Sequence, residues 1–581
     1  MKNDNVKLKI ILRIKNHWPA ILIAFILGFL MILPFFYFQI SLGGQYEGIL
    51  SQIIDDELFY MARIKDVLDG HPTLGNAYLA EYKNQLPQQL FLPEWLLAQP
   101  LKLFNLDVIQ GRIVYNFVLP ALAFILTYTV FYLIYPSRFW ANFFAVFLFF
   151  GLYLFKFTRP VIPQFVFLFW LIQFIFLWLL VEYKYDYISL YHRISKRLLL
   201  ILNIFNFGLL FYLYPFYWTF YLVFFAAVAL IYFFGERLLS KQFFKILAGG
   251  FIIGSFYFYL SFLTNQLPEY QETLTRVQLV FSRSPSEIKT VLPSFLILIL
   301  FIILYRFKFI KINKEILFFI IGIVSILLIT NQNILTGQKF EFGHYRMPAV
   351  FFLVFGLYYL WSKVNFRFKF IIAFLMVILS VNGAYDYAQR ITRVSNKDIY
   401  AQNYRIIFDW FNENTPADSV IYANEEISGL IPVYTSNNVF YSRYANLFIM
   451  ADNEVGERFI LNNFFEEFDR DFAVENERAI WGVRYVDKYG DAVQANKWRK
   501  LLGLELKDET RLPEEEINKV LTRAAEIQNN SLEEGIEEGT KDYKADYFIW
   551  DKNRNPDWQL NNQKFLESVF ENSDFVIYMA K

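Results

Sequence analysis

The sequence has no cysteine and only four histidines among its 581 residues. The lack of cysteine excludes disulfide bonds, thiol catalysis, iron–sulfur clusters and cysteine-ligated zinc. The histidines form no H-E-x-x-H or similar ligand pair, so the sequence offers no support for a zinc hydrolase. Any exported domain must therefore be stabilised by packing alone.

An excess of charge of one sign is also lacking. Lys and Arg number 55 and Asp and Glu 54, which gives a formal net charge of +1. A chain without a global positive field does not attract a polyanion, so we exclude nucleic acid as a partner. The loops G-x-G-x-x-G and G-x-x-x-x-G-K-[ST] are absent from the C-terminal part, which argues against a bound nucleotide-sugar donor.

Long hydrophobic runs, by contrast, are abundant. Hydrophobic residues make up 56% of the chain, against the roughly 45–50% usual in soluble domains. About eleven runs are near the length of roughly 20 residues that crosses a bilayer. We therefore expect a polytopic α-helical membrane domain over 1–390, in contact with the lipid bilayer. The expected spans are 18–40, 112–135, 139–157, 161–182, 198–214, 216–234, 245–264, 291–306, 315–331, 347–361 and 368–386.

The division at Tyr214-Pro215 is the least determined of these boundaries, because the apolar run around it is nearly unbroken. The basic stretch before 18–40 resembles the start of a signal peptide. That run is too long and has no small-residue cleavage site, so we interpret it as a retained helix.

Basic residues gather in alternate connections between the runs, and this pattern indicates the orientation. Lys and Arg are retained on the cytoplasmic side, so the N-terminus is expected there and, after an odd number of spans, the C-terminus outside. His17 and His192 then face the cytoplasm and belong to no outer site. Long external segments remain at 41–111, 265–290 and 332–346. The basic connections are 7–15, 184–197, 237–245, 306–314 and 363–369.

The composition becomes charged and mixed from about Ser395, which predicts an extracytoplasmic α/β domain over 395–581. Strand-like runs include SVIYAN, NNVFYS, DYFIWDK and DFVIYMA, and we expect a helix around 565–570 and a mostly parallel sheet. Glu425, Glu426 and Arg443 follow the first strands, where ligands often bind. The same residues also suit packing onto the membrane domain, which is the interpretation we favour.

Three consecutive acids, Asp55, Asp56 and Glu57, begin an amphipathic segment in the first external loop. One interpretation is a helix N-terminus, where the helix dipole favours acids. The surrounding sequence, DDELFYMARIKDVLDGHP (55–72) followed by PEWLLAQPLKLF and a second span that opens with Arg112, resembles the GT-C superfamily of polytopic membrane glycosyltransferases. The layout of spans, interfacial loop helices and an external C-terminal domain is similar to that superfamily too.

This resemblance implies an inverting glycosyltransferase that takes a sugar from a polyprenyl-phosphate carrier and transfers it to a glycan, lipid or protein acceptor. Asp55 or Asp56 would be the catalytic base. The other would orient it, bind acceptor hydroxyls or hold a metal. Glu57 and His71 are candidates for binding the acceptor, although a loop histidine before proline is more often structural. A divalent metal is unsupported, because the external loop TRPVIPQ carries no second acidic motif.

The donor phosphate requires cations on the outer face. Lys339, His344 and Arg346 precede the tenth expected span, and Arg159 lies in TRPVIPQ. Arginine suits phosphate because its planar donors bind it bidentately. The alternative is that these residues anchor to lipid headgroups. Two other classes, a transporter or flippase and a non-catalytic membrane scaffold, fit the same architecture.

Overall fold

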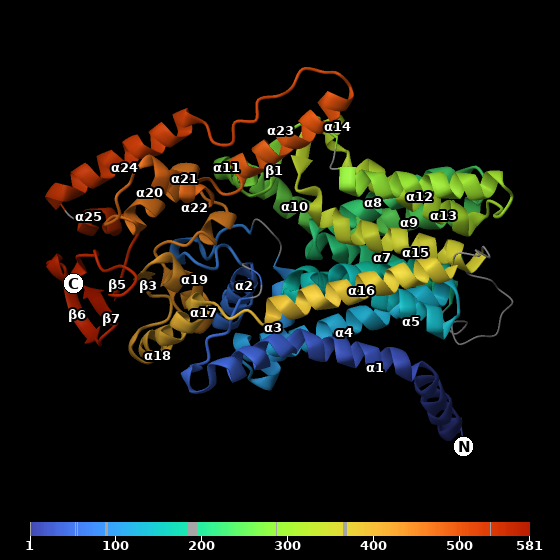
Figure 1. Ribbon diagram of the computed structural model, residues 1–581, viewed down its shortest axis with the longest axis horizontal. Helices are drawn as coiled ribbons and strands as arrows, with labels where there is room; N and C mark the ends of the chain where they lie inside the picture. The colour runs from blue at the N-terminus through green and yellow to red at the C-terminus, as the bar shows by residue number, and fades with distance from the viewer. Residues whose placement is uncertain are drawn as a thin grey trace.

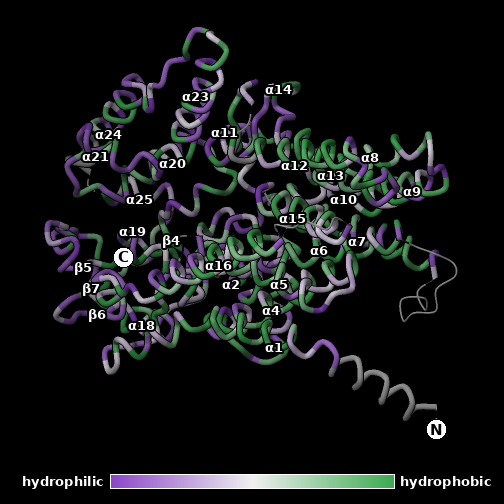
Figure 2. The backbone as a smooth tube through the Cα atoms, turned by 45° about the vertical axis from the view of Figure 1, so that its right-hand side comes forward, coloured by the Kyte–Doolittle hydropathy of each residue, from purple (hydrophilic) through white to green (hydrophobic). Residues whose placement is uncertain are grey.

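The computed structural model describes residues 2–52, 54, 56–87, 91–182, 195–285, 288–363, 369–534 and 536–581. The chain forms a bundle of long helices and a mixed C-terminal part that lies at one end of the bundle (Figure 1). Hydrophobic residues dominate the bundle, whereas the C-terminal part alternates hydrophilic and hydrophobic segments (Figure 2).

Within the described ranges, eight helices are long and apolar enough to cross a membrane. They support a membrane-embedded polytopic protein, as predicted. A ninth candidate combines α9 (Arg237–Ile253) and α10 (Ser255–Thr264), which are bent by 52°. The expected number of about eleven spans is not confirmed, since the runs at 291–306 and 347–361 form helices outside this set. The eight are Asn16–Gln45, Val108–Ile134, Arg138–Thr158, Pro160–Val181, Lys196–Leu213, Pro215–Phe233, Lys314–Thr336 and Lys369–Ile391.

The long apolar run around Tyr214-Pro215 is divided where the sequence suggested. Helix α7 (Lys196–Leu213) ends just before Tyr214, whose backbone is extended with φ −162°. Pro215 then opens α8 (Pro215–Phe233) at its first turn. Proline has no N–H to donate and its φ suits a helix start, so the break follows from local backbone chemistry.

Side-chain amides join α6 (Val166–Val181) to α7 inside the bundle. Gln173 donates to the Asn203 Oδ1 at 2.9 Å, and Asn206 donates to the Gln173 Oε1 at 2.9 Å. All three side chains are buried. Amides that bond across helices stabilise packing in a membrane, where apolar contact with a neighbour gains little over contact with lipid.

The first external loop forms two helices, α2 (Glu57–Asp69) and α3 (Leu92–Phe104). A helix after the acidic triplet is therefore confirmed. Its amphipathic spacing predicts a surface helix, and that position is wrong. Most side chains of α2 are buried, because α3, α4 (Val108–Ile134) and α19 (Glu425–Tyr434) pack around it. The C-terminal part thus covers the first loop. This agrees with the expectation that Glu425, Glu426 and Arg443 lie where the C-terminal part packs onto the rest of the chain.

The C-terminal sheet has five strands in the order β4-β3-β5-β7-β6. Its strands are β3 (Val420–Tyr422), β4 (Asn438–Val439), β5 (Tyr547–Asp551), β6 (Leu566–Glu571) and β7 (Phe575–Ala580). β3 is parallel to β4 and β5, whereas β7 is antiparallel to β5 and β6. The sheet is mixed rather than mostly parallel. The prediction of a helix around 565–570 is also wrong, because this segment forms β6. A tight turn at 572–574 pairs this segment with β7 as a hairpin, and that pairing overrides the local helical pattern.

Arg276, in α11 (Pro268–Val277), fixes the second external segment to the C-terminal part. Its guanidinium is buried and donates to the main-chain carbonyls of Asn446, Phe448 and Met450 at 2.9–3.2 Å. The second and third segments also pair, through β1 (Leu279–Phe281) and β2 (Gln338–Phe340). The three segments that were expected to be external, together with the C-terminal part, therefore form one packed layer at the end of the bundle.

Candidate functional site

Asp56 immediately precedes α2 and pairs with the guanidinium of Arg159. Its side chain is 52% exposed, against 19% for Arg159, so the carboxylate stays accessible beside a mostly covered cation. The Arg159 guanidinium also lies 5.9 Å from the ring centroid of Tyr60. Asp55 lies outside the described residues, so Asp56 represents the predicted acidic pair here.

Further cations surround this ion pair. The charge of Lys156 interacts with those of Arg159, Arg346 and Arg390, and also with that of Asp56. Glu341 in turn lies close enough to Arg159 and Arg346 for its charge to interact with theirs. We call these six residues the charged cluster. Among the described residues, the cluster has four cations and two carboxylates, which is a local positive excess within a nearly neutral chain.

The cluster forms where the ends of several helices meet. Arg159 separates two candidate spans, Arg346 begins α15 (Arg346–Lys363), and Arg390 lies one residue before the end of α16 (Lys369–Ile391). The Arg390 guanidinium stacks 4.4 Å from the ring centroid of Phe155, next to Lys156. Residues that are far apart in the sequence therefore meet on the same end of the bundle as α2.

His344 forms the border of the charged cluster. Its Nδ1 is hydrogen-bonded to the Tyr214 hydroxyl, its Nε2 lies 3.0 Å from the Glu341 carboxylate, and its ring stacks on Phe216. This hydrogen bond from His344 lowers the pKa of the Glu341 carboxyl, and the nearby charges of Arg159 and Arg346 lower it further. Glu341 is therefore ionised at neutral pH and holds His344 in place.

The other predicted site residues lie elsewhere. Glu57 is fully buried and its carboxylate pairs with the guanidinium of Arg112, so it presents no exposed carboxylate to an acceptor. Lys339 is also buried, and its ammonium lies 2.6 Å from an oxygen of Asp491 in α23 (Arg484–Leu501). Both residues occupy structural ion pairs, one in the first loop and one against the C-terminal part.

His71 follows the opposite end of α2 from Asp56. The helix has 13 residues, which separates the two by about 20 Å at 1.5 Å per residue. The ring lies 3.2 Å from Asp66 and 3.5 Å from Asp418, so it joins the first loop to the C-terminal part. The structure thus brings Asp56, Arg159, Arg346 and His344 together and leaves Glu57, Lys339 and His71 outside.

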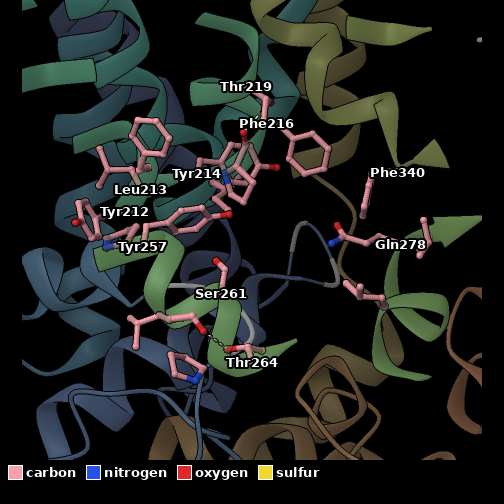
Figure 3. A pocket seen from close by; sticks show the side chains of 18 of the residues that line it. Tyr212, Leu213, Tyr214, Phe216, Thr219, Tyr257, Ser261, Thr264, Gln278 and Phe340 are labelled. Carbon is pink, nitrogen blue, oxygen red and sulfur yellow. Dashed lines mark hydrogen bonds between the residues drawn. The ribbon is translucent and has the colours of Figure 1, made fainter. Parts of the chain in front are cut away.

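A cavity of about 440 Å³ adjoins the cluster (Figure 3). Tyr214 joins the two, since it lines the cavity and bonds to His344. Figure 3 shows Tyr212, Tyr214 and Tyr257 on one side of this space and Phe340 with Gln278 on the opposite side, while Ser261 and Thr264 lie below. We call it the aromatic cavity. Its aromatic lining residues are Phe211, Tyr212, Tyr214, Phe216, Tyr257, Tyr270, Phe340 and Tyr345.

Lys156, Arg390 and Glu341 belong to the site although the sequence analysis did not select them. Each lies near the expected outer end of a span: Lys156 three residues before Arg159, and Glu341 five before Arg346. Charged residues at such positions were the only signal available, and this signal is also typical of headgroup anchors. Among the described residues, no group of three or more histidine or acidic side chains is placed to hold a metal ion.

Comparison with models of known protein families and with curated protein sequences finds no match.

Proposed function

We propose that this protein is a membrane glycosyltransferase of the GT-C type, which transfers a sugar from a polyprenyl phosphate to an acceptor outside the cell with inversion. The observation that carries the proposal is the exposed carboxylate of Asp56 beside the positive excess of the charged cluster. The proposal includes a cytoplasmic N-terminus, an extracytoplasmic C-terminal domain and about eleven spans.

The cluster suits a departing phosphate. Lys156 and Arg159 come from one chain segment, and Arg346 and Arg390 come from the ends of two other helices. The charges of all three arginines interact with that of Lys156. Cations fixed in advance stabilise the negative charge that develops on a leaving phosphate, and arginine adds bidentate hydrogen bonds. The adjoining aromatic cavity offers apolar and hydroxyl-bearing walls for the sugar or for the first part of its lipid carrier.

Asp56 is the candidate base. In the transfer, the acceptor oxygen forms a bond to the anomeric carbon while the bond from that carbon to the phosphate oxygen breaks. The acceptor proton passes to the carboxylate, and the polyprenyl phosphate leaves with the electron pair. A phosphate that binds Arg159 would compete with Asp56 for the same guanidinium, which frees the carboxylate when the donor is present. Asp55 is the alternative base.

The test uses the purified full-length chain in lipid nanodiscs with a panel of polyprenyl-phosphate hexoses and pentoses and with glycan, lipid and peptide acceptors. Released polyprenyl phosphate and glycosylated product are measured by mass spectrometry. Asp56→Asn should lower the transfer rate by about 10²–10⁴-fold. Asp557→Asn, a change at an exposed C-terminal aspartate, is the matched control.

Unchanged transfer by the Asp56→Asn variant, with Asp55 intact, would assign the base to Asp55. Full transfer by the double variant would remove the acidic pair from the mechanism. Movement of labelled donor across the bilayer without product would favour the flippase class instead.

A further inference from the structure

A second, smaller cavity lies at the seam between the first external loop and the C-terminal part. Its volume is about 170 Å³. Gln52 and Leu58 contribute from the first loop, and Glu425, Glu426 and Gly429 from α19. Among the described residues, it shares no lining residue with the aromatic cavity. We call it the seam cavity.

Five charged side chains line this cavity, and four of them form two carboxylate–cation pairs. The fifth, Asp398, accepts a hydrogen bond from the Ser395 hydroxyl. Glu425 accepts hydrogen bonds from the Arg443 main-chain N–H at 3.2 Å, and the Arg443 Nε lies 3.6 Å from the same carboxylate. Glu426 lies 3.4 Å from the Lys397 ammonium and accepts from the Tyr404 hydroxyl at 3.1 Å. The four paired residues and Tyr404 all line the cavity.

Such pairs suit a neutral ligand that is rich in hydroxyl groups. A hydroxyl donates one hydrogen bond and accepts others, so it can bridge a carboxylate and a neighbouring ammonium or guanidinium. Tyr444 and Leu58 add apolar surface for the faces of a ring. The volume is below the roughly 300–1,000 Å³ of sites for drug-sized ligands. One sugar ring fits these features.

Two residues that line the seam cavity flank the candidate base in the sequence. Gln52 and Leu58 line the cavity and stand four residues before and two residues after Asp56, whose carboxylate pairs with Arg159 of the charged cluster. The start of α2 therefore provides Leu58 to the wall of the seam cavity, and the residue just before the helix, Asp56, belongs to the charged cluster.

We propose that the seam cavity binds one sugar residue of the acceptor, so that the acceptor is a glycan. Sugar binding in the seam cavity does not depend on the proposed transfer reaction. The role of the bound sugar as part of the acceptor rests on the proposed function.

The first experiment measures binding alone. The full-length chain in nanodiscs is titrated with a panel of neutral hexoses, pentoses and N-acetylhexosamines, and binding is followed by saturation-transfer NMR. We expect at least one of these sugars to bind. At pH 8, Glu425→Gln should weaken sugar binding by about tenfold or more, because the charge-assisted hydrogen bond of the ionised carboxylate is replaced by a weaker neutral one. Asp557→Asn should leave the affinity unchanged.

A second variant separates binding from folding. A Cβ at Gly429 would lie 3.5 Å from Tyr444 Cε2 and 3.7 Å from Leu58 Cδ1, which are ordinary contacts. Gly429→Ala should therefore fold, and alanine favours the helix. The added methyl group nevertheless occupies the cavity wall between two lining residues, so sugar affinity should fall. Gly456→Ala in α20 (Asp452–Asn462) is the control, because among the described residues no atom lies within 4 Å of a Cβ there.

Absence of binding by every sugar in the panel would overturn the proposal, as would equal affinities for the unmodified chain, Glu425→Gln and Gly429→Ala. Where transfer is observed, a higher acceptor KM with unchanged kcat in Gly429→Ala supports the acceptor role, and an unchanged KM refutes it. Sugar binding without transfer from any donor would contradict the proposed function and leave the binding site intact.

Discussion

Replacement of Glu57 by alanine should destabilise the start of α2, where Asp56 is held. The Glu57 carboxylate is fully buried and pairs with Arg112 of α4, which is itself buried. The same guanidinium lies 4.6 Å from the ring centroid of Phe35 in α1 (Lys2–Leu42) and donates to the Ser51 carbonyl at 3.2 Å. This single ion pair therefore connects the first two long helices to the first external loop.

The magnitude follows from the burial. Glu57→Ala leaves the Arg112 charge buried without its carboxylate, and removal of one partner of a buried pair costs about 3–5 kcal/mol. At 1.4 kcal/mol per factor of ten, this is a change of roughly 10²–10³ or more in the folding equilibrium. The double variant Glu57→Leu with Arg112→Met removes both charges at similar volume, and such replacements are often neutral or stabilising.

Unfolding by SDS in mixed micelles, followed by tryptophan fluorescence, would measure these differences. We expect Glu57→Ala, Glu57→Leu and Arg112→Met each to unfold at lower SDS fractions than the unmodified chain. The double variant Glu57→Leu with Arg112→Met should recover most of the loss of its two single variants. A double variant that loses as much as the two single variants together would refute the reasoning, since it would show that the two charges are not coupled.

Three further predictions concern the site and the topology. Arg346→Lys should lower the transfer rate by about 10- to 150-fold at saturating donor, as expected for the loss of one charge-assisted hydrogen bond of roughly 1.5–3 kcal/mol. Arg346→Ala should lower it further, and equal rates for the lysine variant and the unmodified enzyme would favour a headgroup anchor. Burial raises the pKa of the Glu425 carboxyl from 4.5 to about 7, although the nearby charge of Arg443 opposes this shift. Between these two pH values the native state therefore binds more protons than the unfolded state. The contribution of Glu425 to stability is lost as the pH rises through 7. The difference in unfolding free energy between the unmodified chain and Glu425→Gln should therefore decrease from pH 5 to pH 8, and a constant difference would contradict the assignment. For the topology, an impermeant thiol reagent added to intact cells should label Ser573→Cys, which is exposed between β6 and β7, but not Lys311→Cys; the reverse pattern would invert the predicted orientation.

Local sequence features predicted several elements correctly. The break at Tyr214-Pro215 follows from the missing N–H and fixed φ of proline, which act regardless of the surrounding fold. The helix after the acidic triplet follows from the spacing of apolar residues over 57–69. The strand β6 could not be predicted in this way. It forms by pairing with β7, and the residue pattern within one segment does not specify its partner.

The residues of the candidate site could also be predicted from the sequence only in part. The sequence indicated that Asp56, Arg159, Arg346 and His344 carry suitable chemistry, but each could equally cap a helix, anchor to headgroups or support a loop. It gave no signal that Glu57 would pair with a buried arginine. Burial and pairing depend on neighbours from other elements, and a hydropathy or charge pattern along the chain does not specify them.

The sequence by itself determined that the chain is a polytopic helical protein, because the hydrophobicity of a run of residues is a local property. It also determined which chemistry is excluded, through the residues that are missing. Only the tertiary structure decided that Asp56 meets Arg159, 103 residues away in the chain, and that the C-terminal part covers α2 and closes the seam cavity. Such contacts depend on how helix ends and loops pack against one another in three dimensions, and that arrangement is fixed by many weak interactions acting together rather than by any one segment.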